Sequence, residues 1–267
     1  MTDRIQYTDR VSANLHFSGT VLRIDCGKFI KPALRWPADP RRFRIPPSFT
    51  AAIMIITIDG PAGSGKSTVA RLLAHRLGLR FLDTGAMYRA VALAVIRSQT
   101  SQQDAEAVAK IAANCCIRFE NDRLLLNQED VTNDIRLPEV ATAASIVAAN
   151  PAVRTSLVQQ QQQIGESGGL VTEGRDQGTI VFPRAPFKYF LTASLDARTR
   201  RRLTELEQKG QSGSWEEIRE QIRQRDERDE KRTLAPMKPA ADAVLVDTSE
   251  LSIDQVVELL CRRISSG

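Results

Sequence analysis

Cysteine is scarce in this chain of 267 residues, which has four: Cys26, Cys115, Cys116 and Cys261. Their spacing fits no zinc-binding pattern, and a chain of this length does not need a disulfide framework to fold. We therefore expect buried or unreactive thiols in a reducing cytoplasm. Long apolar runs are also missing: no stretch of about 18 apolar residues occurs, so no membrane span is predicted. The polar residues that follow Met1 do not resemble the apolar core of a signal peptide.

A surplus of one charge sign is missing from most of the chain. Residues 1–53 contain nine Lys and Arg but only four Asp and Glu, whereas residues 54–267 contain 28 of each sign, the rest of the 37 basic and 32 acidic residues. The net charge of +5 therefore belongs to the N-terminal segment and is no evidence that the remaining chain binds nucleic acid. That segment shows no sustained hydrophobic period and contains five prolines, which predicts a poorly ordered extension.

Two interpretations of residues 1–53 are open. Met54 stands directly before the first motif of the chain, so the preferred interpretation is an over-extended gene model whose true start is Met54. The alternative is a real basic tail that contacts RNA or a protein partner. We accordingly predict one catalytic domain over residues 54–267.

The most informative feature present is the segment Gly60 to Ser67, which fits the P-loop pattern G-x-x-x-x-G-K-[ST]. A β-branched run at 53–58 precedes it and predicts a buried strand, and an amphipathic helix is predicted from Thr68 onward. The glycines allow successive backbone N–H groups to surround a phosphate, and the helix N-terminus adds positive potential. We expect Lys66 to reach the β- and γ-phosphates and the Ser67 hydroxyl to ligate Mg²⁺. The motif predicts a nucleoside triphosphate but does not identify what receives the phosphate.

Strands and helices alternate after residue 54, which predicts a parallel sheet with helices on both faces. The five core strands are predicted at 53–58, 80–82, 170–172, 187–191 and 243–246. Helices are predicted from 68, at 86–97, 103–114, 138–149 and 151–164, from 215, and around 253–264. Short strands at 117–119, 124–126 and 129–131 predict a small antiparallel insert. In such a sheet, ligands bind beyond the carboxyl ends of the strands.

The segment after the second predicted strand carries residues that can bind an acceptor. Thr84 is a candidate helix N-cap, which places Tyr88 and Arg89 on the first helical turns. An arginine there can bind a phosphate with two N–H groups, and a tyrosine can donate to one. An ordinary helix cap with a surface arginine is an equal alternative.

The segment after the third predicted strand, residues 173–179, places Arg175 and Asp176 between two glycines. Glycine allows close approach of the backbone to a ligand, arginine can bind a phosphate, and aspartate can accept from a base. The alternative is a salt bridge within a loop. The position at the end of a strand favours the functional interpretation.

The helix predicted from residue 215 changes character along its length. Ile218 and Ile222 define an inward stripe, which then continues in charged residues: Arg225, Asp229 and Arg232, with Arg228 beside them. A solvated helix with i,i+4 ion pairs is the ordinary alternative, but it does not explain charge on the inward stripe. A helix tip that overhangs a phosphate site does explain it. Such a segment can close over ATP as a lid and exclude water.

Together these segments resemble the bacterial cytidylate kinases. The resemblance runs from about Ile55 to the C-terminus and rests on the antiparallel insert and on the segments 60–67, 82–89, 174–183 and 225–229. It implies the P-loop kinase fold, an α/β architecture with a five-stranded parallel sheet, helices on both faces, a nucleoside monophosphate-binding insert over 115–150 and a helical lid over 196–236. Residues 1–53 have no counterpart in the family.

The resemblance implies Mg²⁺-dependent transfer of the γ-phosphoryl group of ATP to CMP or dCMP. It implies a cytoplasmic monomer of pyrimidine nucleotide metabolism that contacts neither membranes nor nucleic acid. It assigns ATP binding to Gly60, Pro61, Ala62, Gly63, Ser64, Gly65, Lys66, Ser67 and Thr68, with Ser67 on the metal. It assigns CMP binding to Thr84, Tyr88, Arg89, Ser145, Arg154, Asp176, Arg225, Asp229 and Arg232. It assigns charge stabilisation in catalysis to Lys66, Arg175, Arg225 and Arg232.

The implied base readers, Ser145, Arg154 and Asp176, suit cytosine chemically. Cytosine offers an amine donor at N4 and acceptors at N3 and O2, and uracil inverts the donor at position 4. A buried mismatch of this kind costs about 1–3 kcal/mol, or roughly tenfold or more in discrimination. No general base is needed, because the attacking phosphate oxygen is already anionic. The sequence departs from the family where Thr84 replaces a common serine and Glu173 a common aspartate, and both changes keep the chemistry.

Two other functions are weighed against this one. A kinase for AMP, UMP or shikimate is disfavoured by the 175–176 pair and by the antiparallel insert. A P-loop nucleotide switch, or a nucleic-acid-binding protein that uses the basic tail, is disfavoured by the arginine-rich lid and the acceptor motifs. The sequence leaves open the preference between CMP and dCMP, and whether Asp59 or Asp176 assists Mg²⁺.

Overall fold

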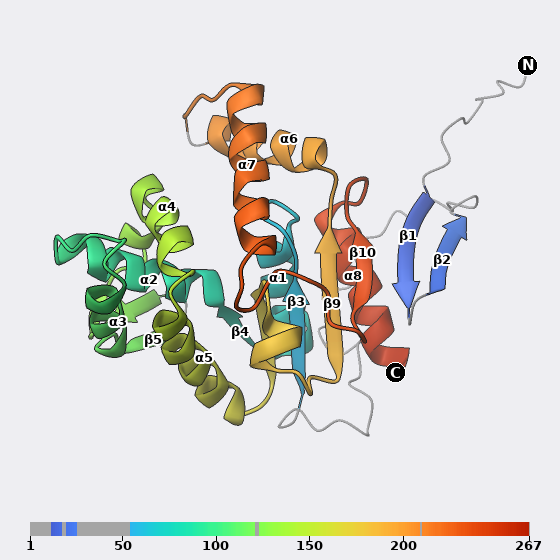
Figure 1. The fold of residues 1–267 in the computed structure, drawn as a ribbon. Helices are drawn as coiled ribbons and strands as arrows, with labels where there is room; N and C mark the ends of the chain where they lie inside the picture. The colour runs from blue at the N-terminus through green and yellow to red at the C-terminus, as the bar shows by residue number, and fades with distance from the viewer. Residues whose placement is uncertain (1–11, 18–19, 26–53, 121–122, 209, 267) are drawn as a thin grey trace, which may run out of the picture.

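The computed structural model describes residues 12–17, 20–25, 54–120, 123–208 and 210–266, the first two ranges as backbone only. A seven-stranded sheet lies at the centre, in the order β2-β1-β10-β9-β3-β8-β4 (Figure 1). Its five parallel strands are β3 (Ile55–Asp59), β4 (Arg80–Asp83), β8 (Leu170–Gly174), β9 (Phe187–Thr192) and β10 (Val244–Asp247). All five predicted core strands are present, and the predicted fold class is confirmed.

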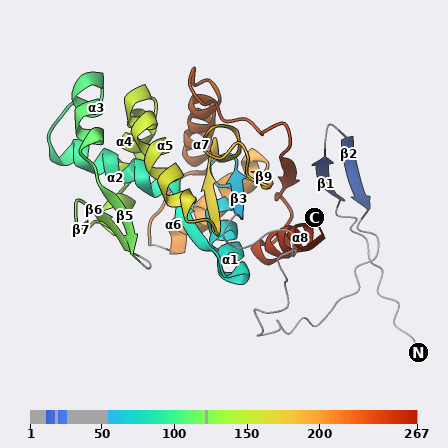
Figure 2. The same ribbon diagram turned by 90° about the horizontal axis from the view of Figure 1, so that it is seen from below.

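Helices cover both faces of the sheet, each face with its own apolar core (Figure 2). On one face α1 (Lys66–Leu77) and α8 (Ile253–Ser266) pack on the parallel strands, and Val69, Leu73 and Leu260 are fully buried there. The other core gathers α2 (Thr84–Arg97), α3 (Ala105–Ala113), α4 (Pro138–Val147) and α5 (Pro151–Glu166). None of the described helices is long and apolar enough to cross a membrane.

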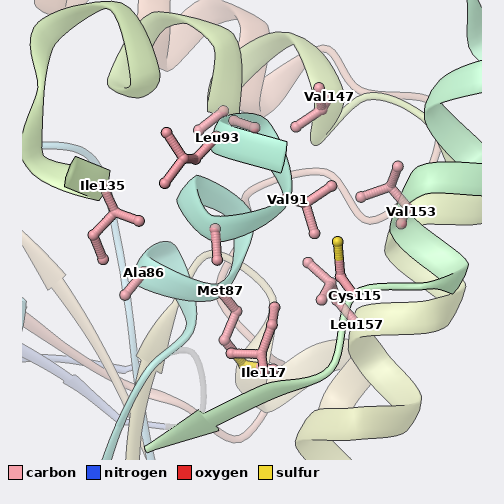
Figure 3. Close-up of a cluster of buried hydrophobic side chains, with 14 of the residues drawn as sticks. Ala86, Met87, Val91, Leu93, Cys115, Ile117, Ile135, Val147, Val153 and Leu157 are labelled. Atoms are coloured by element: carbon pink, nitrogen blue, oxygen red, sulfur yellow. The ribbon is translucent and has the colours of Figure 1, made fainter. Parts of the chain in front are cut away.

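A small antiparallel sheet forms the predicted insert between α3 and α4. Its strands are β5 (Ile117–Glu120), β6 (Arg123–Leu126) and β7 (Glu129–Asp130), followed by a 3₁₀ turn at Asp134–Arg136. Figure 3 shows how Ile117 from β5 packs near Met87 of α2 and Leu157 of α5. Burial of one such side chain contributes about 1.5–3 kcal/mol, so this core ties the insert to α2. The position of α2 matters because its first turns carry three of the predicted acceptor-binding residues, Thr84, Tyr88 and Arg89.

The segment predicted as a lid contains two helices, α6 (Leu195–Gln208) and α7 (Trp215–Glu230), which rise beyond the carboxyl end of β9 (Figure 1). The sequence analysis predicted α7 but not α6, whose few apolar residues give a weak helical period. Ser214 caps α7 by accepting a hydrogen bond from the backbone N–H of Glu217 at 3.2 Å. Ile218 and Ile222 are buried, as the predicted inward stripe requires.

The N-terminal extension predicted over 1–53 lies mostly outside the described residues. The described parts form two strands that the sequence analysis did not predict, β1 (Ser12–Phe17) and β2 (Thr20–Asp25). They pair antiparallel with each other, and β1 pairs antiparallel with β10, which adds two strands to the sheet beside its parallel part. The β-branched residues Val21 and Ile24 give β2 a strand propensity, which the prolines further along obscured. The boundary predicted at Met54 stays a prediction.

Candidate active site

The loop between β3 and α1 has a backbone that only glycine adopts readily. Gly60, Gly63 and Gly65 have φ values of 144°, 76° and 84°. A Cβ atom on Gly60 would lie 2.1 Å from the carbonyl oxygen of Leu191 on β9. The loop therefore packs closely against the neighbouring strand. It leads directly into the N-terminus of α1, where an anion is favoured.

Lys66 is buried at this loop and has no carboxylate partner among its hydrogen bonds; its Nζ donates to the carbonyl oxygen of Pro61 at 2.9 Å. Burial, together with the nearby charge of Arg175, lowers the pKa of Lys66 to about 7, although Glu173 opposes the change. A polyphosphate in the loop would supply the negative charge that this ammonium group lacks. The geometry thus suits a phosphate-binding lysine.

The Ser67 hydroxyl donates to Oε1 of Glu173 at 3.0 Å, which brings a hydroxyl and a carboxylate together beside the loop. This pair fits the oxygen ligands that Mg²⁺ takes at sites where substrate phosphates complete the coordination. Among the described residues no group of three or more His, Cys, Asp or Glu could hold a metal ion. The sequence analysis did not propose Glu173 as a metal ligand. Its position follows from the sheet, because β8 pairs with β3 and places Glu173 beside Ile58.

The two carboxylates that the sequence left open for Mg²⁺ are engaged elsewhere. Asp59 accepts hydrogen bonds from the backbone N–H groups of Gln177 at 2.9 Å and Gly178 at 2.8 Å. These bonds hold the start of a π-helical turn, Gln177–Val181, which the sequence analysis did not predict. Asp176 is paired with the guanidinium of Arg154. Glu173 is therefore the carboxylate that the structure places at Ser67.

Replacing Asp59 with asparagine should remove a pH dependence of stability. Burial raises the pKa of Asp59 from its ordinary value of 3.8 to about 7, although the two backbone N–H groups oppose this. Because the folded-state pKa is raised, the stabilisation is complete below about pH 4 and is lost as the pH rises through 7. Between these limits the native chain should lose about 2–4 kcal/mol of unfolding free energy relative to Asp59→Asn.

Urea titrations from pH 4 to pH 8 measure this difference. Asp254→Asn, which neutralises a carboxylate that is 73% exposed, is the matched control and should follow the native curve. Parallel curves for the native chain and Asp59→Asn would show that the Asp59 carboxyl group titrates normally.

A pocket lies beside the phosphate loop, between α2, α4, the start of α5, the end of β8 and α7. It brings together all nine residues assigned to CMP: Thr84, Tyr88, Arg89, Ser145, Arg154, Asp176, Arg225, Asp229 and Arg232. Arg175 and Glu173 line it too, so the pocket reaches the residue that bonds to Ser67. Segments from residue 84 to residue 232 thus converge on one cavity, which we call the acceptor pocket.

One end of the acceptor pocket carries polar groups suited to a base. Arg154 and Asp176 form a buried ion pair, and the Arg154 guanidinium lies 5.7 Å from the centre of the Tyr88 ring. The Ser145 Oγ is buried without a hydrogen-bond partner in the structure. Such an atom costs free energy unless a ligand pairs with it. Burial raises the pKa of Asp176 even though Arg154 and Arg232 oppose this.

The other end of the pocket gathers arginines around one carboxylate. Arg175 donates through Nε to Asp229 at 2.8 Å, and Arg232 also pairs with Asp229. Although burial opposes it, these two arginines and Arg225 hold the pKa of Asp229 below its usual range. Burial, together with the charge of Arg175, lowers the pKa of Arg225 to about 10. Positive charge exceeds negative charge here, which is the arrangement expected where a phosphate binds.

Thr84 does not have the local role predicted for it. Asp83 is the N-cap of α2, because its carboxylate accepts from the backbone N–H of Ala86 at 2.8 Å, and Thr84 is the first helical residue. The Thr84 hydroxyl instead donates to the carbonyl oxygen of Glu173 at 2.7 Å. Both residue types are good caps, and the acid one position earlier takes the role. Thr84 still lines the acceptor pocket.

An ion pair within the predicted lid also bonds to the phosphate loop, and the sequence analysis missed it. Asp226 of α7 pairs with Arg198 of α6, and both are buried. Arg198 also donates to the carbonyl oxygen of Ala62 at 3.1 Å, and Asp226 accepts from the Ala62 N–H at 3.4 Å. This pair fixes the face that α7 turns to the pocket. Arg228, by contrast, is exposed.

Comparisons with known proteins agree with the resemblance. Residues 56–266 match the family model described as cytidylate kinase. The cytidylate kinase of Pseudomonas paraeruginosa (strain PA7) is 47% identical over 216 residues, which cover 79% of this chain and 94% of that protein. The cytidylate kinase of Paraburkholderia phymatum is 49% identical over 204 residues, with 76% and 90% covered. A shikimate kinase structure from Bacteroides thetaiotaomicron matches 80% of this chain and 97% of its own chain, at 16% identity and a TM-score of 0.44.

Proposed function

Because the chain belongs to the cytidylate kinase family, we propose that it transfers the γ-phosphoryl group of ATP to CMP and dCMP, giving ADP with CDP or dCDP. The observation that carries this proposal is the acceptor pocket. Residues assigned to CMP from five separate segments line one cavity, and Glu173 connects that cavity to the phosphate loop. A nucleotide switch would have no use for a second, arginine-lined pocket at this place.

The donor would bind with its phosphates in the loop of 60–67. The loop N–H groups and the N-terminus of α1 would hold the phosphates, and Lys66 would neutralise the β- and γ-phosphates. Ser67 and Glu173 would hold Mg²⁺, which supplies charge neutralisation for the phosphates when it is bound. The residues present fit a magnesium-dependent phosphotransferase.

The acceptor would bind with its base between α4 and α5 and its phosphate toward the arginines. Ser145, Arg154 and Asp176 would pair with the edge of cytosine, and the unpartnered Ser145 Oγ would gain a bond. Uracil places an oxygen where cytosine has its amine, so a carboxylate that accepts from N4 would face another acceptor. The pocket should therefore favour cytosine over uracil by roughly tenfold or more.

The transfer step needs position and charge, and no residue has to remove a proton. An oxygen of the CMP phosphate would attack the γ-phosphorus, and the bond from that phosphorus to the β-phosphate oxygen would break. Lys66 on the donor side and Arg175 on the acceptor side would neutralise the charge on the transferred group. The Arg198–Asp226 pair would hold α7 against the phosphate loop, with Arg225 facing the pocket and water kept out.

The test is ADP production from ATP and Mg²⁺ with CMP, dCMP, UMP and AMP as acceptors. It should be run on the full chain and on a form that starts at Met54. We expect turnover with CMP and dCMP in both forms, and a kcat/KM for UMP at least about tenfold lower. Turnover with AMP alone would overturn the base assignments. Binding of ATP without turnover of any acceptor would favour the nucleotide switch instead.

Comparison of the two forms also addresses the tail. β1 pairs with β10, which β9 and β3 separate in the sheet from β8, the strand that contributes Glu173 and Gly174 to the acceptor pocket. Removal of the tail should therefore leave kcat unchanged. Loss of activity in the short form would make residues 1–53 part of the working enzyme. The monomeric state, the cytoplasmic location and the absence of nucleic-acid contacts stay predictions.

A further inference from the structure

A second cavity, of about 280 Å³, lies between the body of the sheet and the antiparallel insert. Its walls come from α1 and β4 on one side and from β5, β6 and the 3₁₀ turn on the other, with the start of α2 between them. We call this cavity the insert cleft. None of the residues assigned to ATP lines it, and only Arg89 of those assigned to CMP does. Its volume is close to the lower limit for small-ligand sites, which is about 300 Å³.

The insert cleft is strongly cationic. Five of its lining residues are basic: Arg71, His75, Arg89, Arg123 and Arg136. Asp83 is the one acidic residue that lines it, and Asp83 already pairs with Arg89 at 3.2 Å and caps α2. Glu120 lies 3.8 Å from Arg123, but both side chains are at least half exposed, so solvent weakens that pair. The cleft thus favours an anion.

The wall behind these charges is apolar and partly aromatic. Phe81 of β4 and Phe119 of β5 line the cleft from its two sides, and the buried side chains of Leu124 and Ile135 line it from the insert. The Arg71 guanidinium lies 4.7 Å from the centre of the Phe81 ring. An apolar wall with a rim of arginines matches a ligand that has a flat ring and an anionic group, because each part meets its complement.

Arg89 connects the insert cleft to the acceptor pocket, since it lines both. One of its terminal nitrogens donates to Asp83 at 3.2 Å, and its Nε is buried without a partner. The guanidinium therefore has an unused donor and stands between two cavities. A phosphate in either cavity could accept from it, and the two phosphates would then compete for one side chain.

We propose that the insert cleft binds a small aromatic phosphate, a flat ring that bears one phosphate group, and that this ligand weakens CMP binding by engaging Arg89. The chemistry is shared by nucleoside monophosphates and by phosphorylated ring compounds that are not nucleotides. The ligand would bridge the sheet body and the insert, which carry opposite walls of the cleft. The effect on CMP rests on the proposed function, whereas the binding does not.

Calorimetry on the full chain tests the binding with three probes: GMP, pyridoxine 5′-phosphate and inorganic phosphate. The double variant Arg123→Glu with Arg136→Glu reverses two exposed charges on the insert. His75→Glu places a negative charge on the α1 side of the cleft. Arg118→Glu is the control, because Arg118 is exposed on β5 and does not line the cleft. We expect a ring phosphate to bind the native chain and Arg118→Glu equally, and both cleft variants at least about tenfold more weakly.

The same probes added to the kinase assay test the coupling. The bound ring phosphate should raise the KM for CMP by about threefold or more and leave the KM for ATP unchanged, and the double variant should lose this effect. Unchanged affinity in both cleft variants would place the probe elsewhere and overturn the site. Phosphate binding as tight as the ring phosphates would overturn the aromatic ligand. Normal binding with an unchanged KM would overturn the role of Arg89. Since binding is measured without turnover, its outcome is independent of whether the chain phosphorylates CMP.

Discussion

Lys66→Ala should lower kcat by about 100-fold or more and change the Kd for CMP by less than about threefold. The Lys66 ammonium is buried at the phosphate loop, where its Nζ bonds only to the Pro61 carbonyl oxygen among the described contacts. It lines no part of the acceptor pocket. Its charge is therefore available to the donor phosphates, where negative charge shifts during transfer. Steady-state kinetics with CMP and calorimetry on the variant separate the two effects.

Lys188→Ala is the control for loss of a buried lysine. Lys188 is also buried, and it donates to the Pro183 carbonyl oxygen at 2.6 Å and pairs with Asp242. Its removal should lower stability and leave kcat near the native value, because it lies outside both substrate sites. An equal loss of kcat and CMP affinity in Lys66→Ala would count against a role confined to the donor phosphates.

Arg175→Ala should lower kcat/KM for CMP by about 100- to 1000-fold. Arg175 holds Asp229 through Nε at 2.8 Å and bonds to the Gly174 carbonyl oxygen at 3.1 Å, which fixes its guanidinium at the junction of the two sites. Its charge lowers the pKa of Lys66 and of Arg225, so it is felt on both sides of the transfer. Alanine there would remove a positive charge and leave the buried Asp229 with one arginine fewer.

Arg175→Lys distinguishes charge from geometry. Lysine keeps the charge but has no planar fork, so it should recover only part of the lost activity, about tenfold or less. Arg228→Ala on α7 is the control, since Arg228 is exposed and bonds to the Gln224 carbonyl oxygen of its own helix. Native activity in Arg175→Ala would remove this residue from the mechanism.

Local signals explain what the sequence predicted well. The strand, glycine loop and helix from 55 to 77 follow from a β-branched run, the P-loop glycines and an amphipathic period within one short segment. The inward charges of α7 were readable because Ile218 and Ile222 set the face one turn earlier. The acceptor pocket was assembled from the family resemblance, and the structure brings its members together.

The contacts that the sequence did not reveal connect distant segments. Asp226 meets Arg198, 28 positions away, across two helices of which α6 has too few apolar residues to be recognised. Glu173 meets Ser67 only because β8 lies beside β3 in the sheet, and strand order is not a local property. Asp59 accepts from two backbone N–H groups of the π-helical turn, which lies more than a hundred positions further along the chain. Tertiary pairing decides each of these cases.

The cluster of arginines around Asp229 has a consequence for the life of the protein in a cell. Positive charges that are buried and only partly paired lower the free energy of unfolding, and a bound phosphate would neutralise part of that charge. A protein of this kind is most stable when it is loaded, because ligand binding adds to the free energy of unfolding. Proteases act on unfolded molecules, so survival of the chain would follow the supply of its own substrate. The amount of such an enzyme in the cell would therefore rise and fall with the concentration of its substrate.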